Sequence, residues 1–219
     1  MLHPVKNSVS PPPNNMTAGF VDAASFAIPA AGARVRVIVV QPEQIVTSQI
    51  IVAPKIDGGT VVSDPQRDIL KIAVIERHAG SRRIGLGLVN GLGLHEGALA
   101  SSIAHDSHNI VVVGASDDDM ALAVRTVNGM RGGIAAARGG EVLAKLPLPV
   151  AGLMSEQPLD VMRDAMRELL AAAHTLGCPL SNPYMQMAFL ALPVIPELKL
   201  TDLGLVDVRK FALCDLFVE

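Results

Sequence analysis

The sequence predicts an α+β protein, in which a mixed or antiparallel β-sheet packs against two to three helices. Strand-length runs rich in Val, Ile and Leu recur between residues 34 and 113, and most of their connections are short. Parallel pairs need crossovers of about a dozen residues or more, so short connections favour antiparallel pairing. Two segments with apolar residues at helical spacing follow in the second half of the chain.

The first part of the chain divides into a tail and a β-rich segment. Residues 1–24 are predicted to be a disordered or loosely attached tail, because a run such as Pro11-Pro12-Pro13-Asn14-Asn15 supports no packed element. Residues 25–66 hold predicted strands at 34–40, 46–52 and 60–62. These strands alone would leave open edges, so they form either a small β module or the end of a larger one.

Residues 67–219 are predicted to form the main α+β unit. Its first strands are expected at 68–75, 83–89, 98–103 and 110–113, separated by glycine-rich turns. A helix is expected to start at Ser116, where three aspartates suit its positive end, and to stop near Gly129. A hairpin at 133–146, a long helix that follows Ser155 and is ended by Gly177, a buried helix at 184–192 and short strands at 197–218 complete the prediction.

Composition excludes several classes of protein. Aromatic residues make up 3% and the net charge is −3, with no basic run beyond Arg82-Arg83, so no nucleic-acid partner is expected. No apolar run reaches the roughly 18–20 residues that cross a membrane. Cys178 and Cys214 are too few for a disulfide framework, and we expect a cytoplasmic protein. Half of the residues are hydrophobic, which indicates a surface covered by another domain or subunit and hence a homo-oligomer.

The glycine-rich run at 85–93 invites comparison with a dinucleotide-binding loop. That loop needs a strand-to-helix turn with the helix N-terminus facing a pyrophosphate. Here Asn90 stands in place of the third glycine, and no amphipathic helix follows. We therefore interpret these glycines as structural turns and sites of close strand packing.

The run His105-Asp106-Ser107-His108-Asn109 is the strongest candidate site. Five polar side chains lie between two apolar strands, which is where a scaffold usually presents functional groups. The two imidazoles could bind a divalent metal, hold a substrate or exchange protons, and His105 and His108 are weak candidates for metal ligands. The alternative is a polar turn whose side chains satisfy nearby backbone groups.

Other polar residues give weaker signals. His78 or His95-Glu96 could join the cluster in space, and Arg77, Arg82 and Arg83 either hold an anion or lie on the solvated surface. Ser101 and Ser102 precede His105 but follow a strand pattern, not a nucleophile elbow. His3, in the tail, and His174, on a helix face, are expected to be uninvolved.

Several long motifs carry a family resemblance. They include Arg77-His78, Arg83-Ile84-Gly85-Leu86-Gly87, the run from Ala100 to Asn109, the run Leu146-Pro147-Leu148-Pro149-Val150-Ala151-Gly152-Leu153-Met154-Ser155, and the run Leu192-Pro193-Val194-Ile195-Pro196-Glu197-Leu198-Lys199-Leu200-Thr201-Asp202. From about residue 35 to the C-terminus, the chain closely resembles the C-terminal domain of bacterial adenine deaminases of the amidohydrolase superfamily.

The resemblance implies hydrolysis of adenine to hypoxanthine and ammonia. It also implies a divalent metal, Mn or Fe, held in a (β/α)₈ barrel that bears a His-x-His pair. The sequence contains no His-x-His and has no room for that barrel, so we expect a fragment, a truncated product or half of a split enzyme. Residues 25–66 would then be a remnant of the β-sandwich that flanks the barrel, and the barrel would be a partner in cis or in trans. The loop 105–109 is expected to face the barrel mouth.

Two alternatives remain open at this stage. One is a non-catalytic purine-binding or assembly module that kept its fold without the barrel. The other is a self-contained metalloenzyme that uses His78, His105, Asp106 and His108.

Overall fold

The structure is a computed structural model that describes residues 16–219. The predicted tail falls largely on residues 1–15, which lie outside the described residues together with His3. Residues 16–24 differ from a loosely attached tail, because Ala18 and Val21 are buried. The backbone N–H and the hydroxyl of Thr17 both donate to the carbonyl of Arg77, at 2.8 and 2.9 Å. This segment is therefore part of the packed unit.

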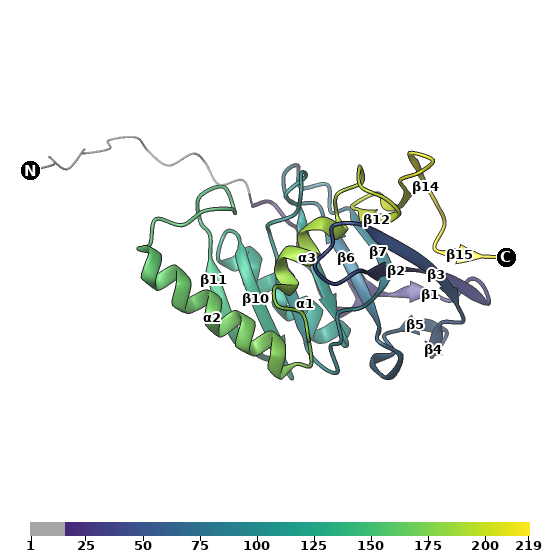
Figure 1. Ribbon diagram of the computed structural model, residues 1–219, viewed down its shortest axis with the longest axis horizontal. Coiled ribbons are helices and arrows are strands. Elements are labelled where there is room, and N and C mark those ends of the chain that lie inside the picture. The colour runs from purple at the N-terminus through teal and green to yellow at the C-terminus, as the bar shows by residue number, and fades with distance from the viewer. Residues whose placement is uncertain (1–15) are drawn as a thin grey trace, which may run out of the picture.

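One mixed sheet of nine strands organises the molecule (Figure 1). Its strands pair antiparallel except for β2 and β7, which run parallel, so the predicted mixed or antiparallel sheet is confirmed. Across the sheet the strands are β11 (Glu141–Pro147), β10 (Gly133–Arg138), β8 (Ala98–Ser101), β9 (Ile110–Gly114), β6 (Ile69–Ile75), β7 (Ile84–Asn90), β2 (Arg34–Val40) and β15 (Phe217–Val218), and β3 (Thr47–Val52) pairs with β2.

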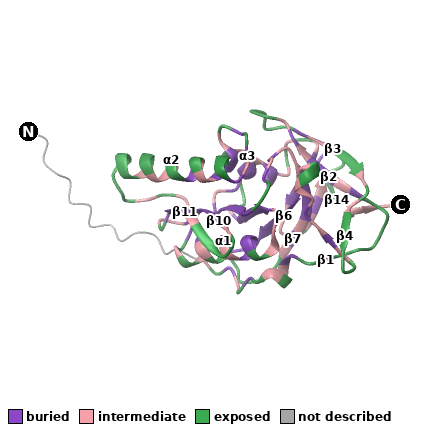
Figure 2. Ribbon diagram, turned by 90° about the horizontal axis from the view of Figure 1, so that it is seen from below, coloured by how far each residue is buried: buried purple, intermediate pink, exposed green. Residues whose placement is uncertain are grey.

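Helices cover both faces of this sheet, which explains why its central strands are apolar throughout. Helix α1 (Asp117–Gly129) packs on one face, and α2 (Leu159–Thr175) and α3 (Pro183–Leu190) pack on the other (Figure 2). Successive residues of β6 alternate between the two sides: Ile72 belongs to the core under α2 and α3, whereas Ala73 belongs to the core under α1. Every residue of β6 is consequently buried.

The helix starts follow from local capping. Ser116 caps α1 as predicted, and its hydroxyl accepts from the backbone N–H of Asp119 at 3.4 Å. Helix α2 follows Ser155 as predicted and begins at Leu159; in the turn before it, the Ser155 hydroxyl accepts from the N–H of Gln157 at 3.2 Å. Pro158 then directly precedes the first helical residue, and Asn182 caps α3 through the N–H of Met185 at 3.1 Å.

Two small sheets lie beside the main one. Strands β1 (Ile28–Pro29), β5 (Thr60–Val62) and β4 (Lys55–Asp57) form the first, and share a small core with the end of the main sheet. Strands β12 (Leu198–Thr201), β13 (Gly204–Asp207) and β14 (Ala212–Leu213) form the second, which contacts β7. Short 3₁₀ helices occur at Ala23–Phe26 (η1) and Pro65–Arg67 (η2).

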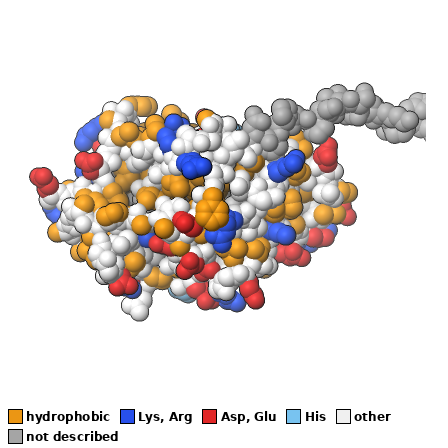
Figure 3. Space-filling model, turned by 180° about the vertical axis from the view of Figure 1, so that it is seen from behind, with side chains coloured by type: hydrophobic (Ala, Val, Ile, Leu, Met, Phe, Trp, Pro, Cys, Tyr) orange, Lys and Arg blue, Asp and Glu red, His pale blue; other side chains and the backbone are white. Residues whose placement is uncertain are grey.

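The surface of the described residues has mixed character. On the face seen from behind, acidic and basic side chains are interspersed among apolar ones (Figure 3). Cys178 and Cys214 are both free thiols. Across residues 16–219 no helix combines the length and the apolar character needed to cross a membrane.

Candidate functional site

Two polar loops, the one after β6 and the one before β9, meet at one end of the main sheet. Ile75 at the end of β6 and Ile110 at the start of β9 are partners in an antiparallel pair. The segment that follows β6 and the segment that precedes β9 therefore adjoin the sheet side by side. The first segment carries His78 and the second carries the run 105–109. The Nε2 atom of His78 lies 2.7 Å from the carbonyl oxygen of Ser107. The sequence-based suggestion that His78 joins the cluster therefore has a direct contact to support it.

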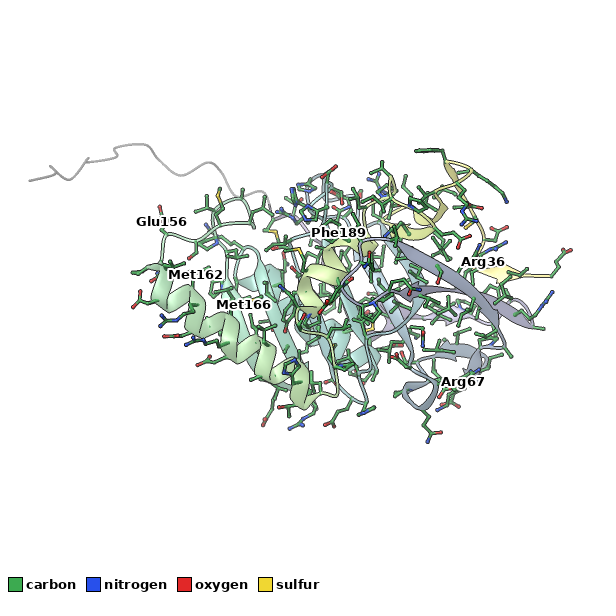
Figure 4. The ribbon with its side chains drawn as sticks, in the orientation of Figure 1. Arg36, Arg67, Glu156, Met162, Met166 and Phe189 are labelled. Carbon is green, nitrogen blue, oxygen red and sulfur yellow. The ribbon has the colours of Figure 1, made fainter. Side chains whose placement is uncertain are left out.

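A compact turn holds the histidines of the loop 104–109. The N–H of His108 donates to the carbonyl of Ala104 at 2.7 Å, and the N–H of His105 donates to the carbonyl of Ala188 on α3 at 3.1 Å. The imidazole of His105 lies against the ring of Phe189, with 4.7 Å between the ring centroids. Phe189 is labelled on α3 in Figure 4. The ring centroids of His105 and His108 are 6.3 Å apart. Helix α3 thus positions one histidine through both its backbone and its ring.

Asn109 links the loop to the far end of the sequence. Its Nδ2 donates to Oδ1 of Asp202 at 3.2 Å, and Oδ2 of Asp202 pairs with Nε of Arg83 at 2.7 Å. Asn109 is 4% exposed, and its Oδ1 is a buried acceptor without a partner in the described structure. The Nδ1 atom of His108 is likewise buried and has no hydrogen-bond partner in the described structure. Buried polar atoms of this kind are rare and mark places where water or another group completes the hydrogen bonds.

The local charges favour a neutral His108. Burial lowers its pKa, and the positive charge of Arg77 and the neighbouring His105 lower it further, while Asp106 acts in the opposite direction. A neutral imidazole has one nitrogen that can accept a hydrogen bond or bind a cation. The loop therefore presents an acceptor at neutral pH.

Glu76 fixes the neighbouring loop, residues 78–83. Its buried carboxylate accepts from the N–H of His78, from the N–H of Ala79 at 2.7 Å, and from the N–H and hydroxyl of Ser81 at 3.0 and 2.8 Å. Burial opposes the charged form, but these hydrogen bonds outweigh it and hold the pKa of Glu76 at about 2. The loop that carries His78 is consequently tied to the end of β6.

The described residues do not assemble a metal centre. Between residues 16 and 219, no group of three or more His, Cys, Asp or Glu side chains is placed to hold a metal ion. The geometry therefore gives no support to a self-contained metalloenzyme built on His78, His105, Asp106 and His108. Metal binding by His105 and His108 stays a prediction.

The remaining candidate residues take part in hydrogen bonds or packing within the fold. Ser102 is fully buried; its hydroxyl donates to the carbonyl of Gly152 at 2.6 Å and accepts from the N–H of Gly133 at 2.8 Å, which agrees with the rejection of a serine nucleophile. The Nε2 atom of His174 lies 3.2 Å from the carbonyl oxygen of Leu180. Within the glycine-rich run, a Cβ on Gly85 would lie 1.8 Å from the carbonyl oxygen of Thr201. This glycine therefore permits close strand packing, as predicted.

Sequence reasoning missed several residues of the site. Arg77 was expected either to hold an anion or to lie on the solvated surface, but it is 3% exposed, because the segments around residues 16, 108 and 151 enclose its side chain. Phe189 and Asp202 come from segments far along the chain, and no local pattern indicates that they meet the loop 104–109. Among the arginines, Arg83 bonds Asp202, and Arg82 is exposed.

Comparisons with known proteins give a consistent result. A family model described as "Adenine deaminase C-terminal domain" matches residues 44–212. An adenine deaminase of Desulfatibacillum aliphaticivorans is 51% identical over 212 residues, which cover 95% of this chain and 37% of the relative. An adenine deaminase of Methanothrix thermoacetophila is 50% identical over 195 residues, or 89% of this chain and 34% of the relative. The chain thus spans about a third of the length of these curated relatives.

Proposed function

This chain belongs to the adenine deaminase family, and we propose that it serves as the C-terminal domain of an enzyme that converts adenine and water to hypoxanthine and ammonia. The observation that carries the proposal is about 50% identity to proteins named adenine deaminase over nearly the whole chain. The relatives are about three times longer, so the activity would belong to the complete protein. As a hydrolase, that protein would act in purine catabolism.

We propose that the loop 104–109 contributes to the purine site of the complete enzyme. The loop concentrates His105, Asp106, Ser107, His108 and Asn109 at one edge of the domain, and His78 contacts it. The exposed Asp106 and Ser107 offer hydrogen-bond acceptors, and an aminopurine offers N–H donors. The ring of Phe189 beside His105 adds a flat apolar surface of the kind that purines stack on.

The metal of the complete enzyme does not fit the residues described here. Family membership implies a divalent ion, expected to be Mn or Fe, but no three suitable ligands lie together in residues 16–219. We propose that an amidohydrolase barrel outside this region holds the ion. The present domain would then bind and orient the purine, with the barrel as its partner in cis or in trans.

The β-rich segment 25–66 supports this arrangement. Strands β1, β5 and β4 form a sheet of their own, and β3 has β2 as its only strand partner within the described chain. Ile50 and Ile51 on β3 are about two-fifths exposed, at 40% and 43%. An open edge with apolar side chains fits the proposal that this segment belongs to a β-sandwich flanking the barrel. The unit from residue 67 onward would be the C-terminal α+β domain proper, and the parallel pair of β2 and β7 joins the segment 25–66 to its sheet.

A second candidate is a non-catalytic purine-binding or assembly module. The lack of a three-ligand metal group in the described residues favours it for the chain acting alone. It predicts adenine affinity without turnover, whereas the leading proposal predicts turnover once the remaining part of the enzyme is supplied.

Complementation tests the proposal. The chain would be mixed with the non-matching portion of the Desulfatibacillum relative and Mn²⁺ or Fe²⁺, and the conversion of adenine to hypoxanthine followed by ultraviolet absorption. We expect turnover only in the mixture. Turnover by the chain alone would contradict the proposed division of labour, and adenine binding with no turnover in any mixture would favour the binding module.

The same assay tests the loop. Replacing His105 and His108 by Ala should lower turnover of the mixture by about tenfold or more, because each removes a group facing the purine. His95→Ala is the matched control, since His95 is an exposed histidine in another turn. Equal activity of the double variant and the control would remove the loop from the site.

A further inference from the structure

We propose that Arg77 is a positioning residue, whose buried guanidinium holds the loop 104–109 and thereby orients His105 and His108. The inference rests on the proposed role of this loop at the purine site and deepens it. It is carried by the contacts, burial and charge environment of Arg77, none of which depends on the identity of the substrate.

The guanidinium of Arg77 joins three segments that are distant in sequence. Its Nε donates to the carbonyl of His108, its Nη2 donates to the carbonyl of Ala151 at 2.9 Å, and its Nη1 lies 3.1 Å from the sulfur of Met16. The backbone of Arg77 is itself held, because Thr17 donates twice to its carbonyl oxygen. A planar group with donors pointing in several directions can bridge two loops at once, which a lysine ammonium on a flexible stem does less well.

The charge of Arg77 is not used in an ion pair within residues 16–219. None of the salt bridges there includes Arg77, and burial lowers its pKa. The preceding carboxylate, that of Glu76, is occupied by the amides of the loop 78–83. Keeping an unpaired cation buried is costly, so its hydrogen bonds to neutral carbonyls have to offset that cost. A residue needed only for packing would not have to be charged.

The surroundings of the guanidinium leave it little freedom. A Cβ on Gly152 would lie 2.8 Å from Nη1 and 3.0 Å from Cζ of Arg77, so glycine at this position makes room for the flat group. On the other side, His108 has a left-handed backbone with φ of 50°, which sets the direction of the carbonyl that Arg77 binds. The loop is thus fixed by its own turn and by Arg77 together.

The consequence lies in the geometry of the imidazoles. His105 is attached to α3 through its N–H and through Phe189, whereas His108 is attached to the scaffold through the carbonyl that Arg77 holds. Losing the guanidinium would free the His108 end of the loop and leave the His105 end in place. We therefore expect a local loosening around residues 106–109 and not a general loss of structure.

The test compares Arg77→Met with Arg77→Lys in this chain. Met keeps much of the volume without charge or donors, and Lys keeps the charge and part of the donor capacity. Readouts are amide hydrogen exchange of residues 105–109, the imidazole ¹⁵N signals of His105 and His108, and the thermal midpoint. Arg125→Met is the matched control, because Arg125 also donates to a backbone carbonyl, that of Val21, which is not part of the loop.

We expect Arg77→Met to stay folded and to exchange the amides of His108 and Asn109 roughly tenfold faster or more, since a hydrogen bond from a charged donor is lost. The His108 signals should shift, Arg77→Lys should restore part of the protection, and Arg125→Met should change neither. A folded Met variant with unchanged exchange and imidazole signals would overturn the proposal.

A second variant covers the case in which Arg77→Met does not fold. Gly152→Ala keeps Arg77 but pushes a Cβ against its guanidinium, so it should produce the same loop-specific exchange. Protection equal to that of the unmodified chain would overturn the proposal just as clearly. None of these readouts needs adenine turnover, so a failed complementation assay would refute the proposed function and leave the role of Arg77 to be judged separately.

Discussion

At the scale of single residues, the site is held by buried polar groups whose partners come from afar. Asn109 and Asp202 are 93 positions apart, yet they form one hydrogen bond at the centre of the candidate site. Arg83, the other partner of Asp202, has a half-exposed side chain, so its ion pair contributes little to stability. The hydrogen bond of the buried Asn109 amide contributes more to stability, because removing one of its partners leaves a buried polar group unsatisfied.

Glu76 gives the first prediction. Its folded-state pKa, about 2, lies below the ordinary value of 4.5, so its stabilisation is present above pH 4.5 and is lost as the pH falls from 4.5 to about 2. Glu76→Gln should lower the free energy of unfolding by about 2 kcal/mol at neutral pH, because an amide accepts these N–H groups more weakly. Urea unfolding across this pH window measures the effect. A deficit that stays constant down to the acid end would show that the carboxylate charge is not its cause.

The pair of Lys71 and Asp117 gives the second prediction. The ammonium of Lys71 is almost fully buried, and lies 2.7 Å from Asp117 and 3.0 Å from the carbonyl of Phe26. Asp117→Ala should destabilise by about 2–3 kcal/mol, because it leaves a buried cation without its counter-ion. Lys71→Met should cost less than half as much, since it removes the buried charge itself. Chemical denaturation measures the stability of both variants. A larger loss for Lys71→Met than for Asp117→Ala would contradict this account.

At the scale of elements, local sequence carried most of the information. The strands 34–40, 68–75 and 110–113 and the helix capped by Ser116 could be predicted because their apolar spacing and capping are local properties. The start of α2 could be placed only as following Ser155, because a local turn that includes Ser155 and Gln157 comes before the first helical residue, Leu159. Which strands pair could not be read from the sequence, because the parallel contact of β2 and β7 depends on the whole sheet.

Strand β7 gives the third prediction, with its own control. A Cβ on Gly85 would lie 1.8 Å from the carbonyl oxygen of Thr201, so the two backbones would have to move apart. The nearest atoms to a Cβ on Gly87 are 3.4 and 3.5 Å away and belong to flexible side chains. Gly85→Ala should therefore destabilise by about 3 kcal/mol, and Gly87→Ala by less than about 1 kcal/mol. Similar thermal unfolding of the two variants would disprove the close approach of β7 and β12.

At the scale of the whole molecule, the sheet has helices on both faces but open edges. The apolar excess of the sequence predicts a surface covered by another domain or subunit, and the fold shows exposed apolar side chains such as Ile50 and Ile51 on the edge strand β3. The loop 105–109 was likewise visible as a polar run between strands, whereas Arg77, Phe189 and Asp202 reach it only through long-range packing. Sequence therefore located the centre of the candidate site, and tertiary structure supplied the residues that hold it.

The open edge of β3 gives the last prediction. Ile50 and Ile51 are adjacent in the strand and point to opposite faces, and both are exposed beside backbone groups that have no strand partner in the described chain. Edges of this kind pair with other strands unless charge prevents it. We expect the isolated chain to self-associate with rising concentration, and the double variant Ile50→Lys, Ile51→Lys to reduce this while changing the free energy of unfolding by less than about 0.5 kcal/mol.

Sedimentation velocity over a concentration series would measure the association, with Leu159→Lys as the control, because Leu159 is an 85% exposed apolar residue on α2. An equal effect of the control would mean that nonspecific association through exposed apolar side chains, and not pairing at the β3 edge, causes self-association. If β3 normally completes a β-sandwich in the whole enzyme, adding the missing portion of a relative should abolish self-association of the unmodified chain. Self-association that persists in the reconstituted enzyme would place the partner of β3 elsewhere, in a second copy of the chain.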